Sequence, residues 1–430
     1  MLVNFRVENF KSFKNLTEFS METTKLKNLI DSNTFDINNI SLLKSAVIYG
    51  ANASGKSSLI DAFRSLKSIL KNSIDIEKTK RYQAQPFLLN TETEGKETFL
   101  EIEFIIEEII YRYGFKIAKN AVILQEWLYQ KKLKIKAREV RLFFREEQDI
   151  TLGTLFKEGK LLAEKTRDNT LFLSVVAQFD GEISKNILTW INQLNTISNL
   201  KSDEFEGFSF SKFEDKEDEE FKEKIINFIK QADVGIYNIE NKNIKFDDLK
   251  QELNLDKEHL KKIPEELILK LEEEGVSKIE TVHMQYDKDN SFKTMKSFDL
   301  EFESDGTQKL LALSGPIIET LSKGEILVVD ELDNSLHTEL VEAIVQLFNS
   351  KETNPNNAQL IFTTHDTNLL NQKLFRRDQI WFTQKDIYGV SELYSLVEYG
   401  TRNDLALEKN YLDGKFGAVP HISSLNYGEN

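Results

Sequence analysis

The sequence predicts an α/β fold with a mainly parallel core sheet, and three segments carry that prediction. Residues 45–49 form a short apolar run typical of a buried strand, and a glycine-containing loop and a helical apolar pattern follow it. The segments 325–329 and 359–363 contain two further apolar runs, at 326–329 and 360–362, and each segment is followed at once by polar side chains. A parallel strand that is covered on both faces is continuously apolar in this way. We therefore expect all three runs to be core strands.

The loop after the first run fits the phosphate-binding pattern G-x-x-x-x-G-K-[ST]. It extends from Gly50 to Ser57, and the helical pattern begins directly afterwards. Backbone N–H groups and the positive end of the helix dipole would meet at phosphates here. Lys56 would bridge the β- and γ-phosphates of ATP, and the Ser57 hydroxyl would bind Mg²⁺. The other predicted nucleotide-binding residues of the loop are Asn52, Ala53, Ser54, Gly55 and Ser58.

Two carboxylates, Asp330 and Glu331, follow the second apolar run. The first carboxylate after such a strand is placed to hold Mg²⁺ through water, and the second can polarise the attacking water. An acidic helix cap is a fair explanation for one aspartate. It is a poor explanation for an Asp-Glu pair in a chain that also has a phosphate loop. We predict that Asp330 is a metal ligand and that Glu331 and Lys56 are catalytic.

A histidine, His365, follows the third apolar run. A lone histidine is usually a satisfied polar group without a catalytic role. Here it stands at the carboxyl end of a predicted strand, where the ligands of open α/β sheets collect. We predict that its imidazole senses the γ-phosphate and the leaving group.

The segment from Ser304 to Gly306 opens a helical apolar pattern, and small residues at a helix start can bind anions. Ser-Asp-Gly also occurs in many ordinary turns. Together with the three preceding elements, however, the segment resembles the signature motif of ABC-type ATPases, a class that includes the SMC and RecF proteins. The resemblance implies that Ser304 and Gly306 contact nucleotide bound by the opposite subunit of a homodimer or higher homo-oligomer. The segment departs from the usual Leu-Ser-Gly-Gly-Gln form, which argues against a transporter subunit.

A further candidate position is Gln178, which follows the apolar-rich run 171–177. This run is either a core strand or a short helix. Its place before a charged, helix-rich insertion resembles that of the glutamine loop in the same class of ATPases. The resemblance implies that Gln178 contacts the nucleotide and its Mg²⁺.

The sequence pattern predicts that the chain has four parts. Residues 1–178 would form an N-terminal ATPase lobe that contains the phosphate loop and an antiparallel side sheet. Residues 179–290 would form a helical insertion, and 291–388 a C-terminal lobe with the signature, the acidic pair and the histidine. The tail, 389–430, either caps the edge of the sheet or docks a partner protein.

Composition excludes several classes of function. The chain of 430 residues has no cysteine, so disulfides, thiolate zinc sites and cysteine nucleophiles are excluded. The N-terminus lacks the apolar core of a signal peptide, and no run approaches the ~20 apolar residues of a membrane helix. We therefore expect a cytoplasmic protein without a membrane partner. The net charge of −15 disfavours indiscriminate binding to nucleic acid.

One local stretch is positively charged although the chain as a whole is negative. Residues 132–138 alternate strictly, which places Lys132, Lys134, Lys136 and Arg138 on one face of a predicted strand. The ordinary explanation is a solvated strand face. The alternative is a basic strip that binds nucleic acid or an acidic partner.

Five stretches narrow the family resemblance: residues 8–14, 49–58, 330–337, 364–366 and 411–420. Together they are similar to the AAA_15-type ATPases of bacterial phage-defence and abortive-infection operons, the RloA or AbiL group. The resemblance implies an ATP-driven dimerisation switch that controls a co-encoded nuclease or toxin. The chain after His365 is shorter than a typical domain of about 100 residues, so we expect any nuclease to act in trans.

The sequence leaves alternatives to that role. A RecF-like DNA-repair ATPase that clamps nucleic acid is the main one. A transporter subunit fits badly, because the signature lies far from the phosphate loop and no membrane partner is implied. A scaffold without hydrolysis is disfavoured because Lys56, Ser57, Asp330 and Glu331 are all present.

Overall fold

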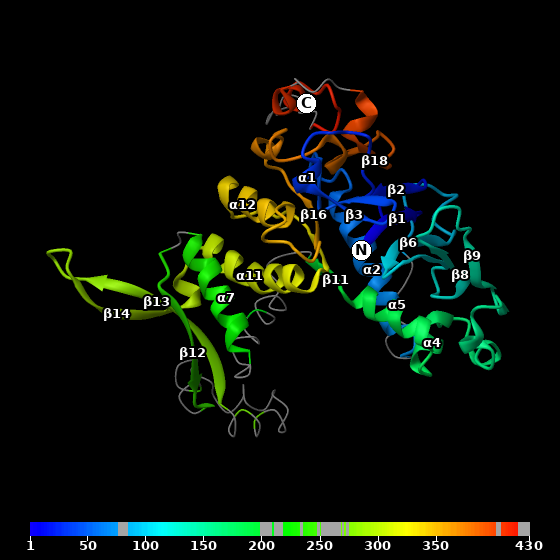
Figure 1. The fold of residues 1–430 in the computed structure, drawn as a ribbon, viewed down its shortest axis with the longest axis horizontal. Coiled ribbons are helices and arrows are strands. Elements are labelled where there is room, and N and C mark those ends of the chain that lie inside the picture. Colours follow the sequence, from blue (N-terminus) through cyan, green and yellow to red (C-terminus); the bar gives the residue numbers. More distant parts are fainter. Residues whose placement is uncertain are drawn as a thin grey trace, which may run out of the picture. The chain divides into compact units, whose positions relative to one another are not determined.

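The structure is a computed structural model that describes residues 1–75, 85–197, 218–232, 235–246, 275–400 and 406–419, together with residues 209, 250, 268 and 271. The chain forms two compact units (Figure 1). The first unit comprises Met1–Asn199 and Thr320–Asn430, and the second comprises Leu200–Glu319. The predicted insertion, 179–290, overlaps the second unit without sharing its limits.

The core of the first unit is a six-stranded sheet in the order β11-β15-β16-β5-β17-β18. Its neighbouring strands are parallel except for the antiparallel pair β17 and β18. The three predicted core strands are therefore adjacent, as β15, β16 and β5. In chain order the strands are β5 (Ser45–Gly50), β11 (Leu194–Ile197), β15 (Ile326–Val329), β16 (Gln359–Thr363), β17 (Ile380–Lys385) and β18 (Ser391–Ser395).

Helices cover both faces of this sheet. Helix α2 (Lys56–Asn72) buries an apolar stripe at i, i+3 and i+4 spacing, and its Phe63 ring stacks on Phe5 at 3.9 Å between ring centroids. Helix α12 (Thr338–Asn349) contacts β5 and β16. Its buried residues are not part of the apolar cluster around α2, which places α12 on the opposite face.

A second, antiparallel sheet is present, as the sequence predicts, and it packs against the α2 side of the core sheet. Its order is β10-β9-β8-β7-β6-β1-β2, and its apolar face joins the same cluster as α2. The strands are β1 (Leu2–Glu8), β2 (Thr17–Ser20), β6 (Thr98–Ile106), β7 (Ile109–Ile117), β8 (Ile123–Lys132), β9 (Val140–Glu146) and β10 (Asp149–Leu152).

The predicted basic strand at 132–138 is not a strand. Strand β8 ends at Lys132, and the chain then turns before β9 begins at Val140. Lys136 has a φ of 65°, a left-handed conformation that reverses the chain rather than extending it. The cations therefore lie on the tip of the β8–β9 hairpin and not on one sheet face.

The remaining elements of the first unit are short. A two-stranded sheet joins β3 (Thr34–Ile37) and β4 (Ile40–Leu43). The other helices are α1 (Ile30–Asn33), α4 (Phe172–Gln178), α5 (Glu182–Asn192) and α13 (Leu407–Leu412). The 3₁₀ turns are η1 (Lys157–Gly159), η2 (Ala163–Lys165), η4 (Thr367–Leu369), η5 (Arg377–Gln379) and η6 (Leu396–Tyr399).

The described part of the tail is folded against the sheet. Tyr411 and Phe416 are 6% and 2% exposed, and both rings stack on Phe382 of β17. The Tyr411 hydroxyl donates to the carbonyl of Ala418, and the Tyr394 hydroxyl donates to that of Phe416. Residues 406–419 therefore cap the sheet, which is one of the two alternatives for the tail.

The second unit combines helices with a sheet. Its described elements are α7 (Glu219–Gln231), β12 (Asn238–Ile244), β13 (Val276–Tyr286), β14 (Phe292–Asp299), η3 (Leu300–Phe302) and the start of α11 (Asp305–Lys323). The three strands form an antiparallel sheet in the order β12-β13-β14. The predicted helical insertion thus contains strands as well, and much of its predicted helical part lies outside the described residues.

Candidate nucleotide-binding site

The phosphate loop joins β5 to α2, in the strand–loop–helix order that the sequence predicts. Its lysine is held by the loop itself, because the Lys56 ammonium donates to the carbonyls of Gly50 at 2.8 Å and Ala51 at 3.2 Å. Burial lowers the pKa of Lys56, and the nearby carboxylates of Asp330 and Glu331 oppose that shift. The ammonium therefore lies in the loop with negative charge close by.

Both glycines of the motif are required because neighbouring atoms lie where a Cβ atom would be. A Cβ on Gly50 would lie 2.4 Å from the hydroxyl oxygens of Ser54 and Thr383. A Cβ on Gly55, whose φ is +125°, would lie 2.6 Å from Ser391 Oγ. Side chains at either position would therefore push the loop away from β17 and β18.

The contacts behind the loop involve residues that the sequence analysis missed. Ser54 Oγ and Thr383 Oγ1 are 2.6 Å apart, and the Ser391 hydroxyl donates to the Ser54 carbonyl at 2.6 Å. Ser12 and Ser58 join through their hydroxyls at 3.0 Å. Ser12 lies in the stretch 8–14 that supports the family resemblance, whereas Thr383 and Ser391 belong to none of the stretches that the sequence singles out, so only the packing of β17 and β18 shows these two.

The acidic pair is held by a threonine of the neighbouring strand. The Glu331 backbone N–H donates to Thr363 Oγ1 at 2.7 Å, and the Thr363 hydroxyl donates to Asp330 Oδ1 at 2.6 Å. The parallel pairing of β15 and β16 brings the carboxyl ends of the two strands together. Glu331 has a φ of 51°, so the chain turns sharply just after Asp330. Thr363 therefore fixes both the side chain of Asp330 and the turn that carries Glu331.

The predicted histidine lies beside the acidic pair. His365 Nε2 is 3.8 Å from Glu331 Oε1, and the His365 backbone N–H donates to Asp333 Oδ2 at 3.1 Å. Burial lowers the pKa of His365, the Lys56 charge lowers it further, and the carboxylates of Asp333, Glu331 and Asp330 oppose the shift. With its pKa below the ordinary value of about 6.5, the imidazole is mainly neutral at pH 7. The pair with Glu331 is then not an ion pair at that pH.

These groups surround one cavity of about 460 Å³. Its walls are the loop residues 52–58 together with Glu331, His365 and Lys385. Lys385, the last residue of β17, is a further residue that the sequence analysis missed. Loop residues 52–58, the predicted base and the predicted histidine therefore meet in a single space that can hold phosphates, whereas Gly50 and Asp330 are not among the residues that line it.

The residues at this site fit a bound Mg²⁺. Magnesium prefers oxygen ligands and keeps several waters while it also binds substrate phosphates. Ser57 offers an exposed hydroxyl on the cavity wall, and Asp330 offers a carboxylate whose Oδ2 accepts no hydrogen bond from the described residues. Within the described ranges, no group of three or more His, Cys, Asp or Glu side chains could hold a metal by itself. A cation here would need phosphate and water to complete its shell.

The structure does not bring Gln178 to the loop. The run 171–177 forms helix α4, and Gln178 is its exposed last residue. The Ser174 hydroxyl of α4 donates to the carbonyl of Leu70, near the C-terminal end of α2. At about 1.5 Å per residue, Leu70 lies roughly 20 Å along α2 from Lys56. This position corrects the prediction that Gln178 contacts the nucleotide and its Mg²⁺.

The strand that borders Asp330 is β11, whose Ile197 carbonyl accepts a hydrogen bond from the Asp330 N–H at 2.8 Å.

The predicted signature residues lie in the second unit, at the start of α11. Ser304 is exposed, and its Oγ accepts from the Thr307 backbone N–H at 3.2 Å. This is the geometry of a helix N-cap. Gly306 lies in the first turn of the same helix. The contact of Ser304 and Gly306 with a nucleotide stays a prediction.

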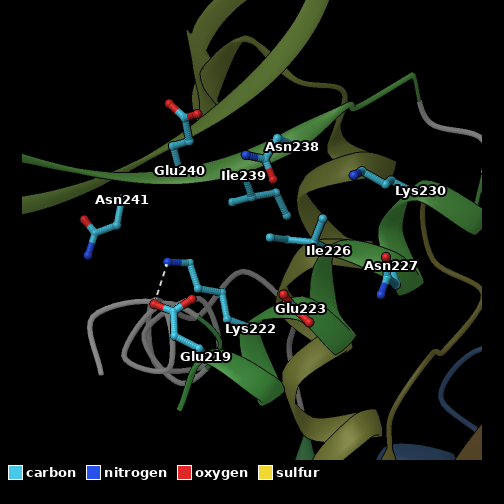
Figure 2. A pocket seen from close by; sticks show the side chains of 10 residues that line it. All are labelled: Glu219, Lys222, Glu223, Ile226, Asn227, Lys230, Asn238, Ile239, Glu240 and Asn241. Atoms are coloured by element: carbon cyan, nitrogen blue, oxygen red, sulfur yellow. Dashed lines mark ion pairs between the residues drawn. The ribbon is translucent and has the colours of Figure 1, made fainter. Parts of the chain in front are cut away.

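A larger cavity, of about 650 Å³, lies in the second unit between α7 and β12. Figure 2 shows Ile226 and Ile239 facing each other amid acidic, basic and amide side chains. Both lysines of this cavity contact neighbouring side chains: Lys222 forms an ion pair with Glu219 at 3.6 Å, and the Lys230 ammonium lies over the Tyr237 ring. The described residues that line this cavity include no glycine, so its size alone does not make it the nucleotide site.

Comparison with solved structures gave weak likenesses to two SMC heads. One is described as "SMC head domain from Thermotoga maritima", with 14% identity, a TM-score of 0.41, and coverage of 92% of this chain and 98% of that chain. The other is described as "Crystal structure of the SmcHead bound to the C-winged helix domain of ScpA", with 14% identity, a TM-score of 0.37, and coverage of 96% and 99%. No curated protein matches the sequence.

Comparison with protein families gave one match, which spans residues 45–371. This range begins at β5, includes the phosphate loop, Asp330 and Glu331, and ends just after His365. In the described part of the chain, no helix has the length and apolar character to cross a membrane. The matched family is AAA_21 and not the expected AAA_15 group. The chain belongs to this AAA-domain family, which is described as "AAA domain, putative AbiEii toxin, Type IV TA system".

Proposed function

We propose that this protein is an Mg²⁺-dependent ATPase of the ABC/SMC-like type. One observation carries the proposal: loop residues 52–58, Glu331 and His365 line a single cavity, and Thr363 hydrogen-bonds both the Glu331 backbone and the neighbouring Asp330 carboxylate. Ser57 and Asp330 would hold Mg²⁺, which neutralises charge on the phosphates when bound. Lys56 would leave its loop carbonyls and pair with the β- and γ-phosphates.

The residues around the cavity fit the roles of hydrolysis. Glu331 would accept a proton from the attacking water, and the neutral His365 imidazole can hydrogen-bond a γ-phosphate oxygen or that water. The Asp333 carboxylate accepts a hydrogen bond from the His365 backbone N–H, which fixes the backbone position from which the imidazole extends. The backbone N–H groups of the loop would neutralise phosphate charge without reorganising.

We propose that the nucleotide lies between two head-to-tail protomers. The side chains of Glu331 and His365 are 47% and 39% exposed, whereas hydrolysis sites usually exclude bulk water. A second protein surface would supply that cover. The exposed helix start at Ser304 of the partner subunit is our candidate, because a helix N-terminus favours anions. ATP would then close the dimer and hydrolysis would open it.

We further propose that this switch acts in the cytoplasm, where it senses infection and controls a co-encoded nuclease or toxin in antiviral defence. The family's description names a toxin of a toxin–antitoxin system, which supports a defence role but not a particular partner. The more specific RloA or AbiL relationship remains part of this proposal.

Two measurements test the proposal. Purified protein should release phosphate from ATP, and EDTA should stop the release. Bacteria that carry the gene with its neighbours should resist phage, and Lys56→Ala should abolish the resistance. Failure of the wild-type protein to bind or hydrolyse ATP would reject the ATPase. Equal phage plating with and without the wild-type operon, across a broad phage panel, would reject the defence role.

One observation favours the alternative of a nucleic-acid clamp. The β8–β9 hairpin tip carries exposed cations within a chain of net charge −15. They are Lys131, Lys132, Lys134, Lys136, Arg138 and Arg141. A gel-shift titration over a range of salt concentrations tests this alternative. Charge reversal at Lys134 and Lys136 should weaken binding and reduce its salt dependence, and unchanged binding would reject the tip as the contact.

A further inference from the structure

We propose that β14, an outer strand of the three-stranded sheet in the second unit, pairs antiparallel with β14 of a second copy of this chain. The contact joins two copies through their β13–β14 hairpins, whose residues belong to none of the nucleotide-binding motifs. It needs no nucleotide. The inference therefore goes beyond the proposed ATPase and does not depend on it.

The outer half of this hairpin is a ribbon of two strands. β12 pairs with β13 over residues 276–282, whereas β14 pairs with β13 over residues 280–286. Beyond Val282 the described residues supply no third strand, and Figure 1 shows the ribbon extending away from α7 of the same unit. A two-stranded ribbon by itself is marginally stable in water, and a third strand stabilises it. The outer half of the hairpin therefore favours the addition of a strand.

The ribbon also exposes large apolar side chains next to one another. Met284 lies opposite Met295, and Tyr286 lies opposite Phe292. The Tyr286 hydroxyl donates to Met284 Sδ at 3.3 Å, so the two cross-strand pairs are neighbours. The exposed fractions of the two methionines are 41% and 38%, and those of Tyr286 and Phe292 are 53% and 56%. Apolar side chains that gather on a surface in this way are typical of a contact with another chain.

Strand β14 is an open edge of the sheet. Among the described strands it pairs with β13 alone, and every residue from Phe292 to Phe298 is exposed. The N–H and C=O groups on its outer side can therefore pair with a strand of another chain. Its two lysines, Lys293 and Lys296, oppose any pairing that sets them against another cation. The edge therefore accepts a partner strand only in a suitable register.

The sequence of β14 supplies such a partner strand itself. In a two-fold antiparallel pair centred on Met295, this residue faces Met295 of the second copy. In the same register Phe292 faces the second copy's Phe298, which is also exposed. Cross-strand pairs of large apolar side chains stabilise a sheet. Each apolar side chain of β14 thus meets another apolar side chain.

The charged residues favour the same register. With Met295 at the centre, Lys293 faces Ser297 and Lys296 faces Thr294, so no like charges lie directly opposite each other. A centre one residue later sets Lys296 against itself. A centre one residue earlier sets Lys296 opposite Phe292. The register centred on Met295 therefore matches both the apolar and the charged side chains, which is the reason to assign the edge to a second copy.

The contact should be weak. One strand of eight residues offers a small surface, and interfaces below about 1,200 Å² are typical of transient complexes. Dilute, nucleotide-free protein should therefore be monomeric, and the hairpin contact should appear as the concentration rises. In the presence of ATP it would join closed dimers to one another rather than replace them.

Introduced cysteines test the register, because the chain has no cysteine of its own. Met295→Cys sets two thiols opposite each other, where facing Cα atoms are about 4.5–5.5 Å apart and a disulfide can form. Ser297→Cys is the matched control in the same strand. Its two copies would lie about 13 Å apart along the strands, which is too far for a disulfide. Lys293→Cys alone is placed equally badly, but it faces residue 297 of the second copy.

Concentrated, nucleotide-free, full-length protein would be oxidised with oxidised glutathione and separated by non-reducing electrophoresis. Met295→Cys should give a linked dimer, whereas Ser297→Cys and Lys293→Cys should each remain mainly monomeric. A mixture of the last two variants should link. Equal linking by Met295→Cys and Ser297→Cys would indicate random collision and would overturn the inference.

Sedimentation velocity over a range of concentrations gives a second readout. The wild type should change from monomer to dimer without nucleotide, and Met295→Lys should stay monomeric because it sets like charges at the two-fold axis. Ile387→Lys adds the same charge at a side chain of the first unit that is 91% exposed, and it should match the wild type. Thermal unfolding would show that both variants keep the wild-type fold. A wild type that stays monomeric while Met295→Cys fails to link, or a Met295→Lys variant that associates normally, would overturn the inference and leave the edge to another occupant.

Discussion

The hydroxyl of Thr363 donates to Asp330 Oδ1 at 2.6 Å, across two parallel strands of the core sheet. The same oxygen of Thr363 accepts from the Glu331 backbone N–H, so one hydroxyl orders both predicted carboxylates. Partners of this kind orient metal-binding and catalytic side chains, and losing them commonly costs 10–100-fold in affinity or activity. Thr363 is thus a positioning residue for the candidate Mg²⁺ ligand.

Thr363→Val should reduce Mg²⁺-dependent ATP hydrolysis by about 10–100-fold. The threonine is fully buried and valine has its shape, so the fold should survive. The apparent affinity for Mg²⁺ should fall along with the rate, which a loss of packing alone would not cause. Thr320→Val is a matched control, because its buried hydroxyl has no hydrogen-bond partner in the described structure. Equal rates in the two variants would contradict the positioning role.

Lys56→Ala should abolish ATP binding or turnover while the fold remains intact. The substitution removes the point charge that the β- and γ-phosphates require. It also leaves the carbonyls of Gly50 and Ala51 without the ammonium that they accept from. Nucleotide titration and circular dichroism would check both parts. Wild-type turnover by this variant would show that the loop is not the ATPase site.

Glu331→Gln should bind MgATP but hydrolyse it about 10²–10⁴-fold more slowly, because the amide cannot accept the proton of water. The backbone N–H that donates to Thr363 is kept. Slow hydrolysis should trap the ATP-bound dimer. Gel filtration with light scattering should then show a species of twice the mass with ATP and not without it. A monomer under both conditions, with normal hydrolysis, would argue against the base and the switch together.

Ser304 can be tested without removing the cap of α11. Aspartate and asparagine have the same shape and both cap helices well, so Ser304→Asp and Ser304→Asn should keep the helix start. Only Ser304→Asp places a negative charge where the partner's γ-phosphate would lie, so it should lose ATPase activity while Ser304→Asn keeps more. Mixing Ser304→Asp with Lys56→Ala should restore at most one site per dimer. If the two Ser304 variants behave alike, a trans contact with phosphate is excluded.

Phe416→Ala should destabilise the first unit. The ring is 2% exposed and stacks on Phe382 of β17, next to the strand that carries the phosphate loop. Removing a buried phenylalanine costs about 3–5 kcal/mol. Denaturant unfolding would measure the loss, with Ile387→Ala as an exposed control that should change little. An unaltered free energy of unfolding would mean that the tail packs weakly and remains available for docking.

Local pattern was enough to predict the central part of the candidate site. The phosphate loop, Asp330, Glu331 and His365 each follow an apolar run that forms a core strand, and β15, β16 and β5 are neighbours. Parallel strands place their carboxyl ends at one edge of the sheet, so polar residues that directly follow such runs meet in space. The prediction that these residues meet did not require knowledge of the strand register.

Two predictions that lacked such a local constraint differ from the structure: the place of Gln178 at the phosphate loop and the basic strand at 132–138. Apolar residues before Gln178 suit a strand or a helix equally, and packing against α2 selected the helix. Strict alternation at 132–138 suggested a strand, but the pairing of β8 with β9 requires a reversal there. In both cases contacts with distant segments decided between conformations that the local sequence allows.

The sequence by itself determined which residues can bind phosphate and activate water, because those groups belong to continuous motifs. Only the tertiary structure showed what holds them and what lies beside them. Thr383 reaches Ser54 from 329 positions away, and Ser391 reaches the same residue from 337. Lys385 reaches the cavity because β17 pairs with β5, which sets Thr383 opposite Gly50. Such contacts depend on strand order and register, which distant parts of the chain fix together when the sheet assembles.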